Sequence, residues 1–176
     1  RYETEEIALI AWMAGFIDGE GYIGISKQVR KNRPSPRYTV YVSVSNTDKE
    51  ILEIFRERYG GNVYNIHERR KDKRGIKWSD AYDWYCPQSS VERLLRDVLP
   101  FLRLKKKQAI LVLKFKRHIR GFSKKRRKGG RLPNGKYIGS EPLPKEEIEW
   151  REKIKTEVQL LNKKGVSSRT MRNVNN

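Results

Sequence analysis

One stretch near the start of the chain constrains the fold more than any other. It runs from Ala8 to Gly21, reads ALIAWMAGFIDGEG, and begins as a helix that Thr4 can cap. Small side chains recur in it every four residues, and such a stripe lets two helix backbones approach closely. The stripe consists of Ala11, Gly15 and Gly19, and the flanking apolar residues that can face a core are Ile7, Ile10, Met13, Ala14 and Ile17.

Two carboxylates stand where this helix must end. Asp18 and Glu20 alternate with Gly19 and Gly21, and a helix C-terminus already carries exposed carbonyls and partial negative charge. Acids are unfavourable there unless a cation binds, and oxygen ligands suit a hard cation such as Mg²⁺. An ordinary buried amphipathic helix accounts for the apolar residues but not for the two acids.

Composition restricts the partners of the chain. Its 176 residues include 40 Lys and Arg against 21 acidic residues, and the net charge of +19 indicates a polyanionic partner, although a ribosomal or membrane-surface protein has a similar charge. The single Cys86 excludes an internal disulfide and fits a reducing compartment, so we expect an intracellular protein in cytoplasm, nucleoid or organelle that is not secreted. No apolar run reaches the length of a membrane span, so no membrane partner is expected.

Hydrophobic periodicity predicts an α+β chain in which helices alternate with pairs of strands. We expect helices from residue 4 to near 20 and over 49–59, 88–98, 104–118 and 145–163, and strands over 22–30, 37–46, 62–70 and 77–86. The strands form one antiparallel sheet with helices on one face, so its polar opposite face must meet water or a ligand.

The polar face of this sheet carries donors and acceptors that can read base edges in a DNA major groove. Each of its side chains is also compatible with an ordinary solvent-exposed strand position. We expect DNA contacts from Ser26, Gln28, Arg30, Arg33, Arg37, Thr39, Tyr41, Ser43, Asn65, His67 and Arg69. The basic run at 124–128 can add contacts to phosphates.

The segment Met13–Gly21 resembles the LAGLIDADG motif of homing endonucleases and fills its nine positions in order. Glu20 stands where the family usually has its catalytic Asp and keeps the carboxylate. The family has an αββαββα core with a saddle-shaped four-stranded sheet, which matches the predicted order over most of residues 4–120. The resemblance implies an endonuclease core at 1–120, a basic irregular excursion at 121–144, and a C-terminal helix and tail at 145–176 in the same domain.

The resemblance also implies the chemistry, which is hydrolysis of DNA phosphodiesters by a Mg²⁺-dependent endonuclease. The Glu20 carboxylate and a helix-end carbonyl, that of Gly19, are expected to bind Mg²⁺, and Mn²⁺ or Ca²⁺ can substitute in binding. On this resemblance a basic residue near the active site lies in LPFLRLKKKQAILVL, at residues 99–113.

Within that segment Lys105 matches the family's active-site lysine, and its alternative role is simple contact with the phosphate backbone. Lys107 and Arg103 are the fallback candidates. Asn46 matches a polar catalytic position of the family, often Gln, although Asn also suits a strand-to-helix turn by itself.

The chain has one such motif and no internal repeat, whereas a double-strand break needs two acid sites. We therefore expect a homodimer that meets along Ala11, Gly15, Asp18 and Gly19 and cuts a long pseudo-palindromic target, leaving short 3′ overhangs. The short chain favours an intron-encoded or free-standing enzyme. The alternatives are an intron maturase whose partner is intron RNA, and a non-catalytic DNA-binding regulator of the same fold.

Overall fold

The computed structural model describes residues 3–31, 33–66, 80–125, 130–131, 133–135, 137–138 and 141–163. The DNA contacts expected at His67 and Arg69 lie outside these residues, as does the tail expected from residue 166 onwards. No helix in the described ranges is both long and apolar enough to cross a membrane.

Five helices and six strands make up the described part of the chain. They are α1 (Thr4–Glu20), β1 (Gly21–Gln28), β2 (Arg37–Asn46), α2 (Lys49–Tyr59), β3 (Asn62–Asn65), β4 (Tyr82–Tyr85), α3 (Val91–Val98), α4 (Lys106–Lys125), β5 (Gly130–Arg131), β6 (Tyr137–Ile138) and α5 (Lys145–Asn162). This order confirms the α+β class and the predicted αββαββα succession.

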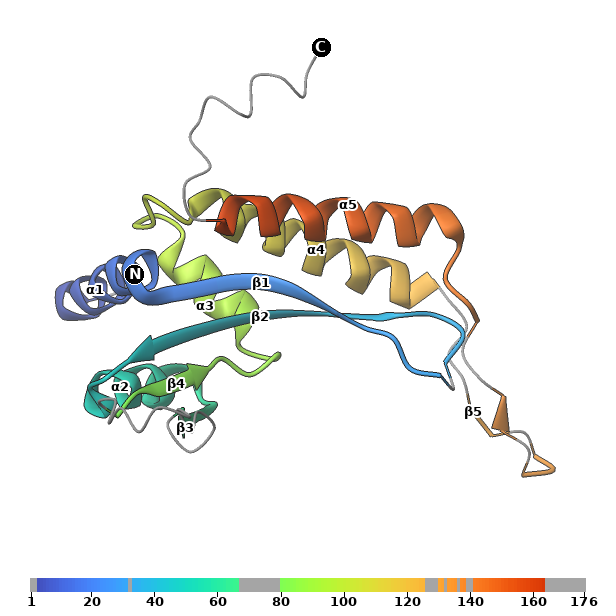
Figure 1. Cartoon of the computed structure of the whole chain (residues 1–176), viewed down its shortest axis with the longest axis horizontal. Helices are drawn as coiled ribbons and strands as arrows, with labels where there is room; N and C mark the ends of the chain where they lie inside the picture. The colour runs from blue at the N-terminus through green and yellow to red at the C-terminus, as the bar shows by residue number, and fades with distance from the viewer. Residues whose placement is uncertain are drawn as a thin grey trace, which may run out of the picture.

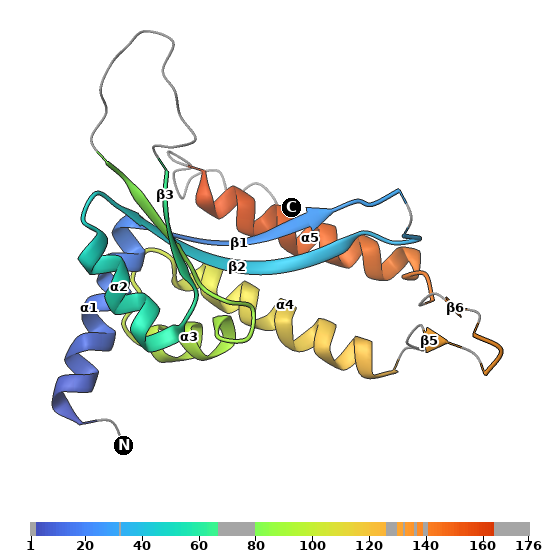
Figure 2. The ribbon, with the colours of Figure 1, turned by 90° about the horizontal axis from the view of Figure 1, so that it is seen from below.

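The first four strands form one antiparallel sheet in the order β1-β2-β4-β3. The long strands β1 and β2 pair from Gly21 with Val44 to Gln28 with Arg37, and β4 lies between β2 and β3. Figure 1 shows α4 and α5 along one side of β1 and β2, with no helix against the opposite side of their outer halves. Figure 2, seen from below, shows β3 and β4 crossing the long hairpin at a steep angle. We call the side of the sheet away from α4 and α5 the open face.

Alternation along the strands separates the core from the open face. On β2 the side chains of Tyr38, Val40, Val42 and Val44 are buried, whereas those between them are partly exposed. Trp84 of β4 is fully buried beside Phe55 of α2, at 5.1 Å between ring centroids, and its Nε1 donates to the Gly60 carbonyl at 2.9 Å. The sheet therefore has one apolar side, as the sequence predicted.

Several predicted boundaries need correction. The N-cap of α1 is Glu3 and no side chain caps it, so Thr4 is the first helical residue rather than the cap. Helix α3 begins at Val91 rather than at residue 88, because residues 88–90 form a turn. Helix α4 was expected to end at residue 118, but it continues through Gly121 to Lys125. The excursion expected to be irregular contains the paired strands β5 and β6. Asp48 caps α2, and its side chain accepts from the Glu50 amide at 2.9 Å.

Helix α5 is fastened to the long hairpin through Glu152. The Tyr38 hydroxyl donates to its carboxylate at 2.5 Å and Lys27 pairs with it at 2.6 Å, while Lys155 of the same helix lies 3.2 Å away. Burial alone would raise the pKa of Glu152, but these three partners outweigh it and lower the pKa from 4.5 to about 2. At the last residue of α5, Asn162 donates to the Ile23 carbonyl at 2.8 Å.

We predict that Glu152→Gln lowers the free energy of unfolding by about 1–2 kcal/mol at pH 7, since it removes a charged acceptor of several hydrogen bonds. A folded-state pKa below the ordinary value stabilises the fold above pH 4.5 and ceases to do so as the pH falls toward 2. Urea unfolding of both proteins across that range should therefore show the difference shrinking below pH 4.5. Glu157→Gln, an exposed change on the same helix, is the control and should alter stability little. Equal losses from pH 7 down to pH 2 would contradict the prediction.

Candidate functional site

The site is built around one buried carboxylate at the end of α1. Asp18 is 8% exposed, and its two oxygens accept the backbone amides of residues 103, 104 and 105 at 2.6, 3.1 and 2.8 Å. These amides directly precede α4, so the carboxylate that they bind lies at the positive N-terminal end of this helix. Negative charge is favoured at such a terminus, so Asp18 fastens the end of α1 to the beginning of α4.

This contact brings Lys105 to the end of α1. Its Nζ donates to the backbone carbonyl of Asp18 at 2.5 Å. Partial burial lowers the pKa of Lys105, while the nearby carboxylates of Asp18 and Glu20 act in the opposite direction. The predicted catalytic pair of Glu20 and Lys105 is thus brought together by the structure, although the two residues are distant in sequence.

Glu20 is the last residue of α1, and its side chain is exposed. Within the described ranges, no hydrogen bond or ion pair engages its carboxylate, and no group of three His, Cys, Asp or Glu side chains surrounds it. One carboxylate beside helix-end carbonyls, including that of Gly19, does not make a complete protein cage. It fits Mg²⁺, which usually keeps waters and completes its shell with substrate phosphate.

Asn46 is the last residue of β2. Two residues earlier, Val44 pairs with Gly21, which follows Glu20 in the chain. Its Oδ1 accepts the backbone amide of Asp48 at 2.8 Å, which is the hydrogen bond of a turn-forming Asn. The turn role therefore has direct support, and the catalytic role of Asn46 stays a prediction.

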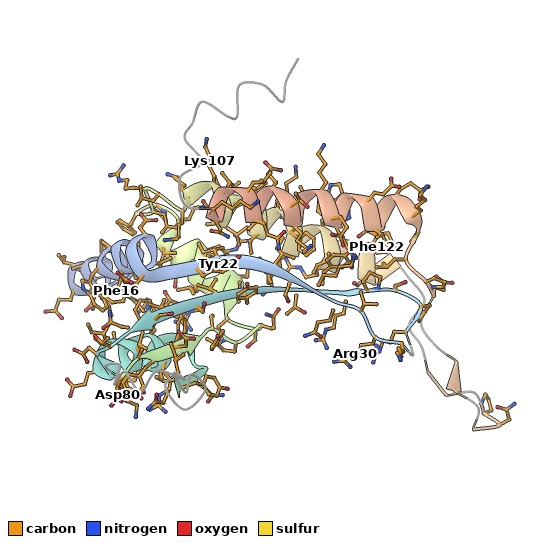
Figure 3. All side chains as sticks on the ribbon, in the orientation of Figure 1. Phe16, Tyr22, Arg30, Asp80, Lys107 and Phe122 are labelled. Carbon is orange, nitrogen blue, oxygen red and sulfur yellow. The ribbon has the colours of Figure 1, made fainter. Side chains whose placement is uncertain are left out.

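The two fallback cations are placed less favourably than Lys105. Arg103 and Lys107 are both exposed. Figure 3 places Lys107 on the helix side of the molecule, away from the open face. Lys105 contacts the end of α1 directly through the Asp18 carbonyl, which supports it as the active-site candidate.

The outer face of α1 is lined by small residues, as expected. A Cβ atom built on Gly15 or Gly19 would meet no atom within 4 Å, so open space lies against both positions. Ala11 on the same stripe is half-buried, and the neighbouring Trp12 is 40% exposed. Asp18 differs from the rest of the predicted interface because its carboxylate faces residues of its own chain.

The open face carries most of the predicted DNA contacts. Those on the long hairpin alternate with buried residues and lie on this side of the sheet: Ser26, Gln28, Arg37, Thr39, Tyr41 and Ser43. Asn65 lies on the opposite, helix-covered side of the sheet. It points the same way as Val63, whose cross-strand partner Trp84 is buried. The same register places Asn62 and Tyr64 on the open face instead.

Of the tyrosines on the open face the sequence analysis expected Tyr41 and missed Tyr22, Tyr64 and Tyr85. Tyr22 and Tyr41 stack with ring centroids 5.4 Å apart, and burial together with a hydrogen bond to Tyr22 raises the pKa of Tyr41 to about 12. Gly24 lies beneath this pair, since a Cβ there would come within 2.4 Å of the Tyr22 ring. Farther across the sheet, Tyr64 meets Tyr85 edge-on at 5.9 Å. The alternation of Tyr22 with Ile23 and Ile25 could have placed Tyr22 on the open face from the sequence alone.

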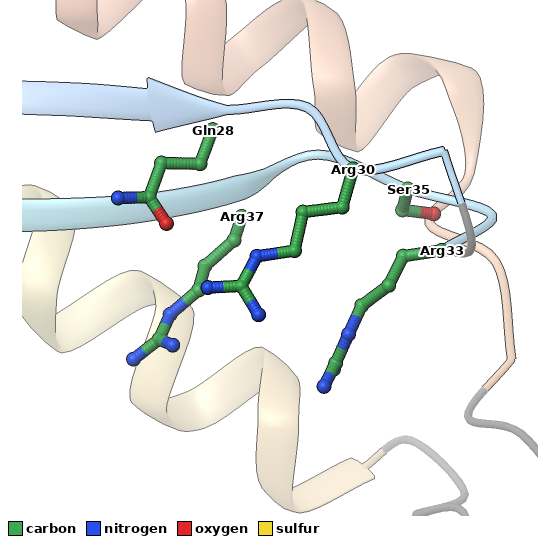
Figure 4. A pocket seen from close by; sticks show the side chains of 5 residues that line it. All are labelled: Gln28, Arg30, Arg33, Ser35 and Arg37. Atoms are coloured by element: carbon green, nitrogen blue, oxygen red, sulfur yellow. The ribbon is translucent and has the colours of Figure 1, made fainter.

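Arginines gather at the far end of the hairpin. Arg30 and Arg33 from the connecting loop and Arg37 from β2 line a shallow pocket with Gln28 and Ser35. Figure 4 shows the arginine and glutamine side chains projecting to the same side of the strands. No acidic residue occurs from 21 to 47, so this end of the open face is suited to a polyanion.

Comparison with known proteins identifies the fold. No protein-family model matches the chain. The crystal structure of the homing endonuclease I-CvuI in complex with the I-CreI target matches with a TM-score of 0.62 and 23% identity, covering 94% of this chain and 89% of that one. The archaeal intron-encoded homing endonuclease I-Vdi141I, complexed with DNA, matches with a TM-score of 0.59 and 17% identity over 90% of this chain and 87% of that one.

A longer protein matches in part. The LAGLIDADG meganuclease I-CpaMI, bound to uncleaved DNA, has a TM-score of 0.52 and 15% identity, and the match covers 85% of this chain but 49% of that one. The chain has the fold of the LAGLIDADG homing endonucleases, which confirms the resemblance that Met13–Gly21 carries.

We predict that Asp18→Asn lowers the free energy of unfolding by about 2 kcal/mol or more, because an amide nitrogen would replace one oxygen that now accepts buried N–H groups. Chemical denaturation measures the loss. Asp48→Asn makes the same change at the exposed cap of α2, where Asn serves about as well as Asp, and should cost less than about 0.5 kcal/mol. Similar losses in the two variants would contradict the role assigned to Asp18.

Proposed function

We propose that the protein is a site-specific DNA endonuclease that hydrolyses phosphodiester bonds with Mg²⁺. The observation that carries this proposal is the meeting of an exposed acid, Glu20, with the half-buried cation Lys105 at the end of α1. A protein that only binds RNA or DNA has no need of such a pair. The fold supports the proposal, since solved proteins that share it are homing endonucleases in complex with DNA.

Each residue at the α1 end has a separate role in the proposed reaction. Glu20 and the Gly19 carbonyl hold Mg²⁺, which supplies positive charge to the scissile phosphate when bound. Lys105 stabilises negative charge that develops on the attacked phosphate. Asp18 positions Lys105 through the amides of residues 103–105 and touches no substrate.

DNA binding in this proposal uses the open face. A two-stranded β-ribbon fits the major groove of B-DNA, and the hairpin β1–β2 presents hydroxyls, an amide and guanidinium groups along one side. Gln28 and Arg37 are direct cross-strand neighbours, suited to base edges, whereas Arg30 and Arg33 in the loop are suited to phosphates. The +19 charge favours both kinds of contact.

A double-strand break requires two sites, and we propose that a homodimer supplies them. The open space beside Gly15 and Gly19 suits close packing of α1 against its copy about a two-fold axis. This chain covers 49% of I-CpaMI but 89% of I-CvuI, which agrees with one unit of the fold per chain. The dimer would place two Glu20 carboxylates near the axis, over a long pseudo-palindromic target, and leave short 3′ overhangs. The proposal includes an intron-encoded origin.

We predict that Glu20→Gln reduces cleavage of the preferred duplex by at least about 100-fold while leaving its affinity for that duplex largely unchanged. The carboxylate is lost as a metal ligand, but the side chain keeps its size at an exposed position. Gel assays of cleavage and binding in Mg²⁺ check both parts. Glu57→Gln on α2 is the matched control and should cleave normally. Unchanged cleavage by Glu20→Gln would remove this residue from the reaction.

We predict that Gly15→Leu separates the dimer and abolishes double-strand cleavage, because four extra carbons fill the space needed by the facing helix. Sedimentation measures the mass of the particle, and circular dichroism checks that the helices are retained. Gly121→Leu is the control, since Gly121 also lies on a helix with open space beside it. A single subunit in the unmodified protein bound to DNA would overturn the dimer.

A further inference from the structure

One side chain on the open face has the wrong charge for a surface that meets DNA. Asp83 is the only acidic residue in the four strands of the sheet. It alternates with the buried Trp84 and pairs across the sheet with Ser45, so it lies on the open face and is half-buried. A carboxylate there repels phosphates and lowers affinity for every duplex, whatever its sequence.

Two neighbouring hydroxyls hold this carboxylate in one orientation. Ser45 donates to Oδ1 at 2.5 Å, and Tyr85 donates to Oδ2 at 3.3 Å. Within the described residues, no Lys or Arg forms an ion pair with Asp83. A carboxylate has about four acceptor positions, so two donors leave it able to accept further hydrogen bonds.

The chemistry of such an acceptor on the open face is selective. In the major groove, cytosine N4 and adenine N6 are amino donors, whereas guanine O6 and thymine O4 are acceptors. A fixed carboxylate attracts the first pair and repels the second. Proteins can gain specificity through groups that repel the wrong partner. Such a gain in specificity offsets the affinity for DNA that the negative charge of Asp83 costs.

We propose that Asp83 is a specificity-determining residue. It selects a base that presents an amino group in the major groove, cytosine or adenine, at one base pair of each half-site. The proposal rests on the proposed function, because it requires the open face to enter the major groove. Ser45 and Tyr85 are positioning residues that aim the carboxylate. The hairpin β1–β2, whose strands contain no acidic residue, supplies affinity for any duplex, and Asp83 of β4 disfavours guanine and thymine.

The test is selection of bound duplexes from a random library by the full chain and its variants. The unmodified protein should enrich cytosine or adenine at one position of each half-site. Asp83→Asn adds an N–H donor at the same size and should shift that position toward guanine or thymine by about 5- to 100-fold, the range of one good base contact. Ser45→Ala keeps the carboxylate but frees its orientation, so it should weaken selection at the same position only.

Glu149→Gln is the charge-matched control. Glu149 lies on α5, on the covered side of the sheet, and the change alters net charge by the same amount. Its profile should match that of the unmodified protein. If Asp83→Asn binds all duplexes more tightly by one common factor, as a pure charge change would, the inference is overturned while target selection and cleavage by the unmodified protein stand. If the unmodified protein enriches no sequence, the proposed function and the inference both fail.

Discussion

Three backbone amides that converge on the Asp18 carboxylate hold the candidate site together. Through them, residues 85 to 87 positions apart in the chain become neighbours, and the beginning of α4 is fixed to the end of α1. Lys105 adds a further contact to the same residue, since its Nζ donates to the Asp18 carbonyl. The two acids at the end of α1 thus have separate tasks: Asp18 faces inward and accepts three backbone amides of its own chain, whereas Glu20 is exposed.

Much of the fold could be predicted because it follows from local patterns. The alternation of Val40, Val42 and Val44 defined the buried side of β2, and the polar residues between them were placed correctly on the open face. The α1 motif predicted both its own helix and the family resemblance. Local patterns were less informative in short elements: β3 has four residues, too few to fix the parity of Asn65, and the cap of α1 proved to be Glu3 rather than Thr4.

The contacts that complete the site were beyond local reasoning. Sequence analysis placed Asp18 at the expected dimer interface, and no periodicity indicates that its partners are the amides of residues 103–105 of its own chain. The pairing of Tyr22 with Tyr41 depends on the register of β1 against β2, and the association of Ser45 with Asp83 depends on β4 lying between β2 and β3. Such facts come from strand order, which the sequence does not display.

Gly24 has a consequence for how a protein of this kind can change over evolutionary time. The stacked rings of Tyr22 and Tyr41 occupy the space above it, and any side chain at this position would displace them. Under the proposed function, adaptation to an altered DNA target would therefore proceed through other side chains of the open face, such as Ser26 or Thr39. Position 24 is closed to that process, so it would persist as a constant point in a surface that otherwise drifts with its target.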